Sequence, residues 1–193
     1  MHTVSYSIGL AGRYRMHVGL RQQAATLPGS PFELQVSPGA AYAPATRLPP
    51  KVRSGGVVGK EWHSLTLTAA DKMGNNCVSG GAPMRATSLT AGRELQTSTI
   101  DNQDGTYTLQ WRSEQSGTYN MHVTIDGAHV IGSPCPLIML AARPEVSQSY
   151  VYGDGLYEAT AGKPSLIHVR CKDKYGNAAL PSKEVRTRAP ALA

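Results

Sequence analysis

Two glycine-containing segments carry residue types that bind phosphate or calcium in other proteins. Residues 55–61 (GGVVGKE) resemble a phosphate-cradling loop, but the spacing is one residue short, and Glu61 stands where a Ser or Thr would hold magnesium. Residues 101–105 (DNQDG) resemble a calcium loop, but the glycine comes one position early and the bidentate Glu is missing. Turns beside strands explain both segments, so we expect neither nucleotide nor calcium binding.

Histidine and cysteine are the other residue types that hold metals or act as nucleophiles. The six histidines have no metal-ligand spacing, and no Gly-x-Ser-x-Gly motif occurs. Cys77, Cys135 and Cys171 have no nearby basic or helical context that would lower a thiol pKa. Cys171 continues the inward alternation of a strand, so we expect it, like Cys135, to be buried. The sequence therefore predicts no catalytic residue, metal or cofactor, and hence no enzyme.

The composition favours short strands and many turns. The chain has 193 residues, with 20 Gly and 13 Pro but one Phe and two Trp, which argues against a helical bundle. The length suits about two sandwich domains of roughly 100 residues each. The longest apolar run, residues 137–142, is far shorter than the roughly 18 residues of a membrane helix. We expect no membrane span.

The charge and the cysteine usage bear on partners and compartment. The formal net charge is +6, but the 19 Lys and Arg residues are scattered along the chain, so we expect a solvated basic surface and no nucleic-acid partner. The first residues lack the features of a signal peptide. Three widely spaced cysteines and the absence of an Asn-x-Ser/Thr sequon fit a reducing compartment. We therefore expect a cytoplasmic protein.

Two motifs occur twice in the chain, which indicates internal repeats. The pattern Gly-x-Tyr-x-Met-His-Val occupies residues 12–18 and 117–123, and a Gly-Ser-Pro sequence follows each copy. Residues 59–75 and 162–177 share Gly-Lys followed by Asp-Lys-x-Gly-Asn. Each block combines a strand with a turn.

Apolar and polar residues alternate between these turns, which is the period of a half-buried strand. Leu65, Leu67 and Ala69 alternate with threonines, and Tyr107 with Leu109 and Trp111 forms a second such series. The strands recur about every ten residues, as expected for an antiparallel sandwich.

The motifs resemble a known family in their order and spacing. DNQDGTY (residues 101–107), SGTYNMHV (116–123) and IGSPCPL (131–137) are similar to the second half of a filamin-type immunoglobulin repeat. Residues 153–177 and, less closely, 54–75 resemble the first half of such a repeat. The resemblance implies an all-β fold of immunoglobulin-like β-sandwiches, with one complete filamin-type repeat plus two complementary half-repeats.

The resemblance also divides the chain. We expect the C-terminal half of a repeat (strands E, F and G) at 1–36, a Pro/Ala-rich linker at 37–50, a complete repeat at 51–141, the N-terminal half of a repeat (strands A and B, with a C strand at 184–188) at 145–188, and a tail at 189–193.

Neither half-repeat can bury a sandwich core alone, because each owns only two or three strands. We expect the two halves to form a composite repeat within one chain, because the effective concentration is high there. Head-to-tail pairing between chains would instead build a filament. The third alternative is that the chain is a fragment, or that another protein supplies the missing halves.

The resemblance implies a partner-binding groove between strands C and D, where a peptide adds as a further strand. The matching residues are Arg85, Thr87 and Leu89 on strand C and Glu94, Leu95 and Thr97 on strand D. We therefore expect a non-enzymatic structural or scaffolding protein of the cytoskeleton, an accessory of an actin network or a ciliary axoneme. The alternative is an extracellular or surface adhesion module, because bacterial immunoglobulin-like repeats also use an Asp-x-x-Gly-Asn strand ending.

Overall fold

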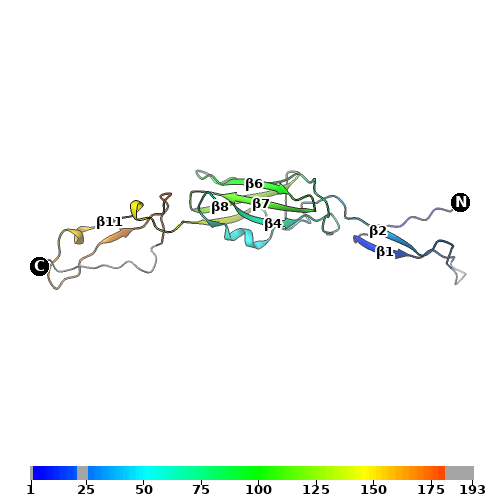
Figure 1. The fold of residues 1–193 in the computed structure, drawn as a ribbon, viewed down its shortest axis with the longest axis horizontal. Coiled ribbons are helices and arrows are strands. Elements are labelled where there is room, and N and C mark those ends of the chain that lie inside the picture. The colour runs from blue at the N-terminus through cyan, green and yellow to red at the C-terminus, as the bar shows by residue number, and fades with distance from the viewer. Residues whose placement is uncertain (1, 21–25, 181–193) are drawn as a thin grey trace.

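The computed structural model describes residues 2–20 and 26–180, which form strands and short 3-10 turns. The elements in chain order are β1 (Gly12–Met16), β2 (Phe32–Val36), η1 (Pro50–Ser54), β3 (Gly56–Val57), β4 (His63–Thr68), β5 (Met84–Ser88), β6 (Gln96–Asp101), β7 (Thr106–Arg112), β8 (Gly117–Ile125), β9 (Ala128–His129), β10 (Cys135–Leu140), η2 (Val146–Gln148), β11 (Tyr150–Tyr152), η3 (Asp154–Leu156) and β12 (His168–Arg170). They form an elongated molecule with a sandwich in the middle and a two-stranded sheet at each end (Figure 1).

The central sandwich consists of two sheets. One has the strand order β4-β7-β6, and the other has the order β3-β10-β8-β5 with β9 paired to β8. All pairings are antiparallel except that of β3 with β10. In immunoglobulin lettering β4, β5, β6, β7, β8 and β10 are strands B, C, D, E, F and G. The predicted all-β immunoglobulin-like fold is confirmed.

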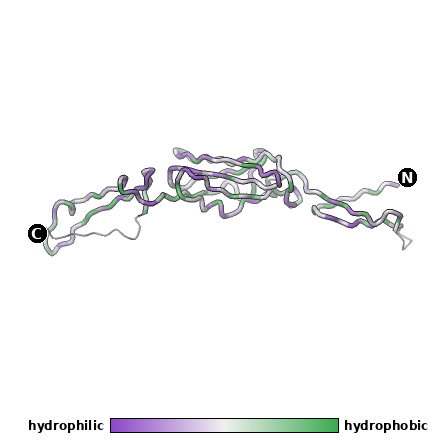
Figure 2. Tube along the Cα trace, viewed as in Figure 1, coloured by the Kyte–Doolittle hydropathy of each residue, from purple (hydrophilic) through white to green (hydrophobic). Residues whose placement is uncertain are grey.

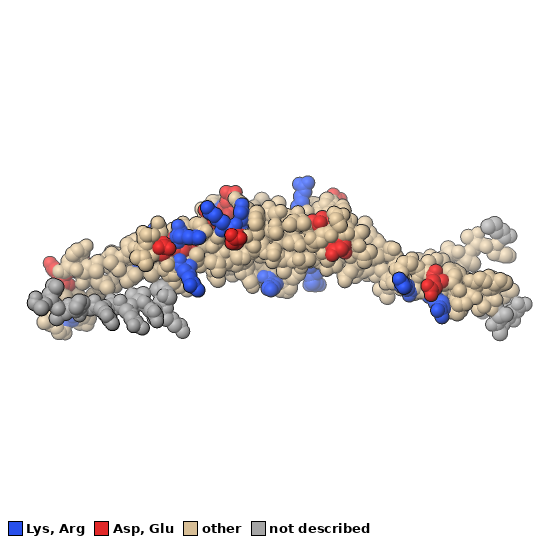
Figure 3. All heavy atoms as spheres, in the orientation of Figure 1, with Lys and Arg blue, Asp and Glu red and all other residues tan. Residues whose placement is uncertain are grey.

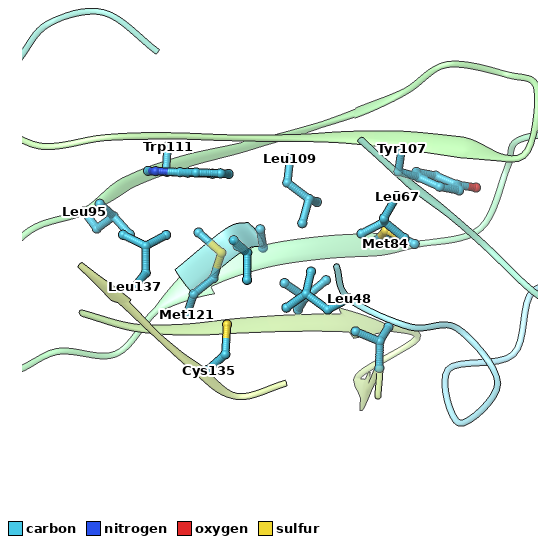
Figure 4. Packing of buried hydrophobic residues seen from close by; sticks show 14 of the residues in the cluster. Leu48, Leu67, Met84, Leu95, Tyr107, Leu109, Trp111, Met121, Cys135 and Leu137 are labelled. Atoms are coloured by element: carbon cyan, nitrogen blue, oxygen red, sulfur yellow. The ribbon is translucent and has the colours of Figure 1, made fainter. Parts of the chain in front are cut away.

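The core lies between the two sheets, where the alternation in the sequence places it. Leu109 and Trp111 point inward from β7, and Met121 points toward them from the opposite sheet (Figure 4). All three side chains are buried. The Trp111 indole Nε1–H donates to the carbonyl oxygen of Gly55 at 2.8 Å, so its polar atom is satisfied inside the core.

The hairpin between β6 and β7 requires its glycine. Gly105 has a φ of 85°, and a Cβ at this position would collide with the carbonyl oxygen of Cys77. Both the left-handed backbone and the close approach therefore exclude a side chain here. The predicted turn residues 101–105 thus set the register of the strand that carries Leu109 and Trp111.

The segment predicted as a linker belongs in part to the sandwich. Ala43, Thr46 and Leu48 are buried. The Ala70 N–H donates to Thr46 Oγ1 at 3.0 Å, and Arg47 forms a parallel bridge with Ile131. The structure thus differs from the predicted linker at 37–50. The Ala- and Pro-rich composition indicates a linker, but several residues of this segment pack over the end of the core.

The two end segments each have a two-stranded sheet and exposed apolar positions. Val4 precedes the first Gly-x-Tyr-x-Met-His-Val motif by as many residues as Leu109 precedes the second. Val4 is 80% exposed, whereas Leu109 is 0% exposed. Val169 of β12 is 41% exposed, against 2% for Leu67. The apolar residues of both end segments, green in Figure 2, have no second sheet over them among the described residues.

The arrangement differs from the predicted closure within one chain. The end segments lie at opposite ends of the sandwich (Figure 1), so they form no composite repeat with each other among the described residues. Cys135 is buried as predicted, but Cys171 is only partly buried because the described part of its end segment has a single two-stranded sheet. The expected C strand at 184–188 lies outside the described residues.

A matched pair of leucines tests the core. Leu109→Ala removes a fully buried side chain and leaves a cavity, so we expect the unfolding free energy to fall by about 2–5 kcal/mol. Leu89→Ala removes a side chain that is 71% exposed, and we expect a change within about 0.5 kcal/mol. Urea unfolding followed by tryptophan fluorescence measures both. Equal losses would contradict this assignment of the core.

Candidate partner-binding edge

Two strand edges face each other on one side of the sandwich. β5 is the last strand of its sheet, and β6 is the last strand of the other. The Ala86 N–H donates to Thr99 Oγ1 at 3.1 Å, and the Ala86 carbonyl accepts from Thr97 Oγ1 at 2.9 Å. Two side-chain hydroxyls thus occupy the outward backbone groups of β5 at the place where a neighbouring strand would bind.

The register of β6 explains why these two hydroxyls reach β5. Thr97 pairs with Trp111 and Thr99 pairs with Leu109, so both threonines share the inward face of their sheet. A hydroxyl on this face needs a hydrogen-bond partner, because an unpaired buried polar group costs free energy. The edge backbone of Ala86 supplies that partner.

The six predicted site residues occupy different environments. Arg85 and Thr87 are exposed on β5. Leu89 lies just beyond β5 and is 71% exposed, and Glu94 is exposed just before β6. Leu95 instead points into the core near Trp111 and Leu137 (Figure 4) and is buried, so its side chain is not available to a partner.

Thr97 lies on β6 as predicted, but its role differs from that of a surface contact. Its hydroxyl and that of Thr99 close the edge from inside. Thr99 and Ala86 were not predicted from the sequence. The signal was available, because two threonines two residues apart on an edge strand share one face, and hydroxyls on an apolar face indicate a buried polar contact.

The phosphate-loop-like segment folds as part of the sandwich. Gly56 and Val57 form β3, and His63 Nε2 lies 2.8 Å from the carbonyl oxygen of Val57. A Cβ on Gly56 would collide with the His63 ring. The His63 ring therefore fills the space next to the Gly56 backbone.

The calcium-like segment is a capped hairpin turn. Asp101 accepts the Gln103 N–H at 2.8 Å, and Asp104 accepts the Thr106 N–H at 2.9 Å. The hydrogen bonds from Thr106 lower the pKa of Asp104. In the described part of the chain, no three His, Cys, Asp or Glu side chains gather as metal ligands.

A hollow of about 350 Å³ lies beside the end of β7, and charged residues line it. Its arginine is already engaged. Arg112 Nε donates to Gln96 Oε1 at 2.8 Å, one of its terminal nitrogens donates to the Lys60 carbonyl at 2.9 Å, and its guanidinium lies over the Trp62 ring. These contacts fix the side chain as part of the scaffold.

The remaining surface and thiols offer little further chemistry. Burial raises the pKa values of the Cys77 and Cys135 thiols, so the reactive thiolate is disfavoured. On the face in Figure 3, basic and acidic residues lie interspersed. None of the described helices has the length and apolar composition needed to cross a bilayer.

Comparisons with known proteins agree with the sandwich. Filamin-C of Rattus norvegicus is 29% identical over 87 residues, which are 44% of this chain and 3% of that protein; filamin-C of Mus musculus gives 28% over 85 residues and the same coverage. The chain thus spans only about 3% of the length of these relatives.

Solved structures share the fold at low identity. The Escherichia coli adhesin FdeC is 19% identical with a TM-score of 0.58, over 86% of this chain and 52% of that one. Invasin, a bacterial integrin-binding protein, is 18% identical with a TM-score of 0.53, over 83% of this chain and 32% of that one. The Filamin/ABP280 repeat matches residues 37–136, more than half of the sequence. This chain therefore belongs to the Filamin/ABP280 repeat family.

Proposed function

We propose that this chain is a non-enzymatic structural protein of the cytoskeleton that binds partner proteins by strand addition at β5. One observation carries this proposal: among the described residues, the hydroxyls of Thr97 and Thr99, and no strand, occupy the outward backbone groups of Ala86. Membership of the filamin repeat family supports a role in protein interaction, and the similarity to filamin-C favours the cytoskeleton.

Strand addition at this edge exchanges one set of hydrogen bonds for another. The backbone of an extended peptide would replace the two threonine hydroxyls at Ala86 and continue the sheet beyond β5. Arg85 and Thr87 would then flank the peptide on the outer face, with Leu89 beyond them. The peptide that suits this edge carries an acidic residue for Arg85 and an apolar residue for Leu89.

The threonine contacts can be tested in the unbound protein. Thr99→Val removes the acceptor of the Ala86 N–H and leaves that buried donor unpaired. We expect Ala86 amide exchange to quicken and the unfolding free energy to fall by about 1–3 kcal/mol. Thr66→Val is the control, because Thr66 is exposed and its hydroxyl bonds to the Thr108 hydroxyl on the outer face of the sheet. Identical exchange at Ala86 in both variants would contradict the role of Thr99.

Co-pelleting tests the partner class. We expect the full chain to pellet with actin filaments or with microtubules, and Arg85→Glu to weaken the binding several-fold because it reverses a charge at the proposed edge. Lys51→Glu makes the same charge change at an exposed site on η1 and should bind like the wild type. The cytoskeletal role would be refuted if the protein pelleted with neither actin filaments nor microtubules. Recovery of the protein at the cell surface on fractionation would also refute it.

We propose further that the half-repeats, residues 1–36 and 145–188, complete each other between copies of the chain. In the central repeat β4 pairs with β7, so β12 of one copy would pair with the segment around Val4 of another. The apolar positions exposed in each end segment support this pairing, because their counterparts in the central repeat are buried. Copies joined in this way would form head-to-tail chains.

Sedimentation across a range of concentrations tests the pairing. We expect the mean mass to rise with concentration, because the chance of contact between complementary apolar faces rises. Val4→Asp should shift this association to higher concentration by placing a charge on such a face. Val146→Asp is the control at a site that is 89% exposed outside both sheets. A mass that stays monomeric at all concentrations would rule out pairing between copies.

A further inference from the structure

The Asp-Lys-x-Gly-Asn motif forms the same interdomain contact twice. We call residues 71–75 and 173–177 the Asp–Asn turns. In the first turn, Asn75 Oδ1 accepts the Ala11 N–H at 2.9 Å, and Asn75 Nδ2 donates to the Gly9 carbonyl at 2.8 Å. Gly9 and Ala11 belong to the N-terminal end segment, so this side chain connects that segment to the central repeat.

The second turn repeats this geometry one repeat later. Asn177 Oδ1 accepts the Ser116 N–H at 2.8 Å, and Asn177 Nδ2 donates to the Glu114 carbonyl at 2.8 Å. Glu114 and Ser116 lie in the loop between β7 and β8, which is the E–F loop of the central repeat. Two independent places in one chain thus carry the same pair of hydrogen bonds.

A carboxylate holds each asparagine in position. Asp71 accepts the N–H groups of Met73 and Asn75 at 2.9 Å each and the Asn75 Nδ2–H at 2.9 Å. It also accepts the Gly39 N–H at 2.8 Å, from the segment that leads into the central repeat. The hydrogen bonds, that from the Asn75 side chain first, lower the pKa of Asp71 to about 2, so the carboxylate is ionised at neutral pH.

Asp173 forms the corresponding network in the second turn. It accepts the N–H groups of Tyr175 and Asn177 at 2.9 Å each, the Asn177 amide, and the Ala142 N–H at 2.9 Å. Ala142 follows β10 and leads into the next half-repeat, as Gly39 does in the first turn. One carboxylate therefore connects the turn, its asparagine and the chain that joins the two repeats.

A tyrosine of the same domain holds each receiving loop. The Tyr119 hydroxyl donates to the Gln115 carbonyl at 2.6 Å, and the Tyr14 hydroxyl donates to the Leu10 carbonyl at 2.9 Å. In each loop the asparagine of the next repeat binds the residues on both sides of this carbonyl. The loop is thus ordered by its own domain before the neighbouring turn binds, which lowers the entropic cost of the contact.

The asparagine amide binds backbone atoms of the receiving loop and none of its side chains. The loop residues are Gly-Leu-Ala at 9–11 and Glu-Gln-Ser at 114–116, which share no side chain. The asparagine amide pairs with a carbonyl and with the N–H two residues later, as a neighbouring strand would. The Asp–Asn turn therefore recognises the backbone conformation of the loop and not its sequence.

We propose that the Asp–Asn turn is an interdomain clamp that recognises the E–F loop backbone of the preceding repeat and holds successive repeats in one fixed relation. The residue before the glycine adds an apolar contact. Tyr175 packs against the buried cluster of the central repeat, and the side chain of Met73 reaches close to Gly9. The clamp leaves β5 free, so it acts independently of partner binding at that edge.

Amide exchange in the full chain, measured by NMR, tests the clamp at Ser116. Ser116 belongs to the complete repeat, and Asn177 accepts its N–H. We expect Asn177→Ala to quicken Ser116 exchange roughly tenfold, as for the loss of a net hydrogen bond. Asn177→Asp keeps an oxygen that can accept the Ser116 N–H, but it loses the hydrogen bonds to the Glu114 carbonyl and to Asp173 and places a second negative charge beside that carboxylate. We expect this repulsion to displace the side chain, so that Ser116 exchange quickens in this variant as well at pH 7.

The first clamp provides the matched comparison. Asn75→Ala should quicken exchange at Ala11 and leave Ser116 unchanged, whereas Asn76→Ala, an exposed neighbour outside the contact, should change neither. The Tyr119 amide, in the core, reports whether a variant remains folded. Equal Ser116 exchange in the wild type and in folded Asn177→Ala would overturn the clamp, as would loss of Ser116 protection in Asn75→Ala.

Discussion

A β-sheet with one apolar face must cover that face, and this constraint governs the whole chain. The central repeat meets it, because β7 and β8 belong to opposite sheets and bury Leu109 and Met121 against each other. In the N-terminal end segment the counterpart of Leu109 is Val4, which is 80% exposed outside the strands, and the counterpart of Met121 is Met16, which is only partly buried on β1. The same sequence pattern therefore builds a covered core in one place and a partly covered sheet in another.

The joints between the repeats depend on a different kind of interaction. Asp173 is fully buried, and burial alone would raise the pKa of its carboxyl. Hydrogen bonds from Asn177, Ala142 and Tyr175 outweigh that effect and lower the pKa. A buried charge with this many donors is restricted in geometry, so the turn, the connecting chain and the asparagine move together or not at all.

The sequence predicted the sandwich well, because two-residue alternation identifies inward side chains such as Trp111 wherever both sheets are present. The sequence-based prediction was wrong where the local composition does not indicate which residues are buried. Thr46 lies in a stretch of Ala and Pro that resembles a linker, and Leu95 sits next to exposed residues yet enters the core. The alternation of Thr97 and Thr99 indicates a buried polar contact, but the group that they meet, the backbone of Ala86, lies on the other sheet and cannot be identified from a single strand.

The clamp and the proposed partner edge occupy different parts of the sandwich, and this separation has a consequence for sequence change. The clamp uses loops between strands, whereas β5 is the edge strand of its sheet. Because the asparagine binds backbone atoms, side chains in the receiving loop can vary as long as they leave room for the turn, as at Gly9, where Met73 lies close. Substitutions at Arg85 or Leu89 likewise leave the joints intact. Tandem repeats built on this plan can therefore diverge in partner choice while the spacing and orientation of their binding edges stay constant, provided that the aspartate and asparagine of each turn are kept.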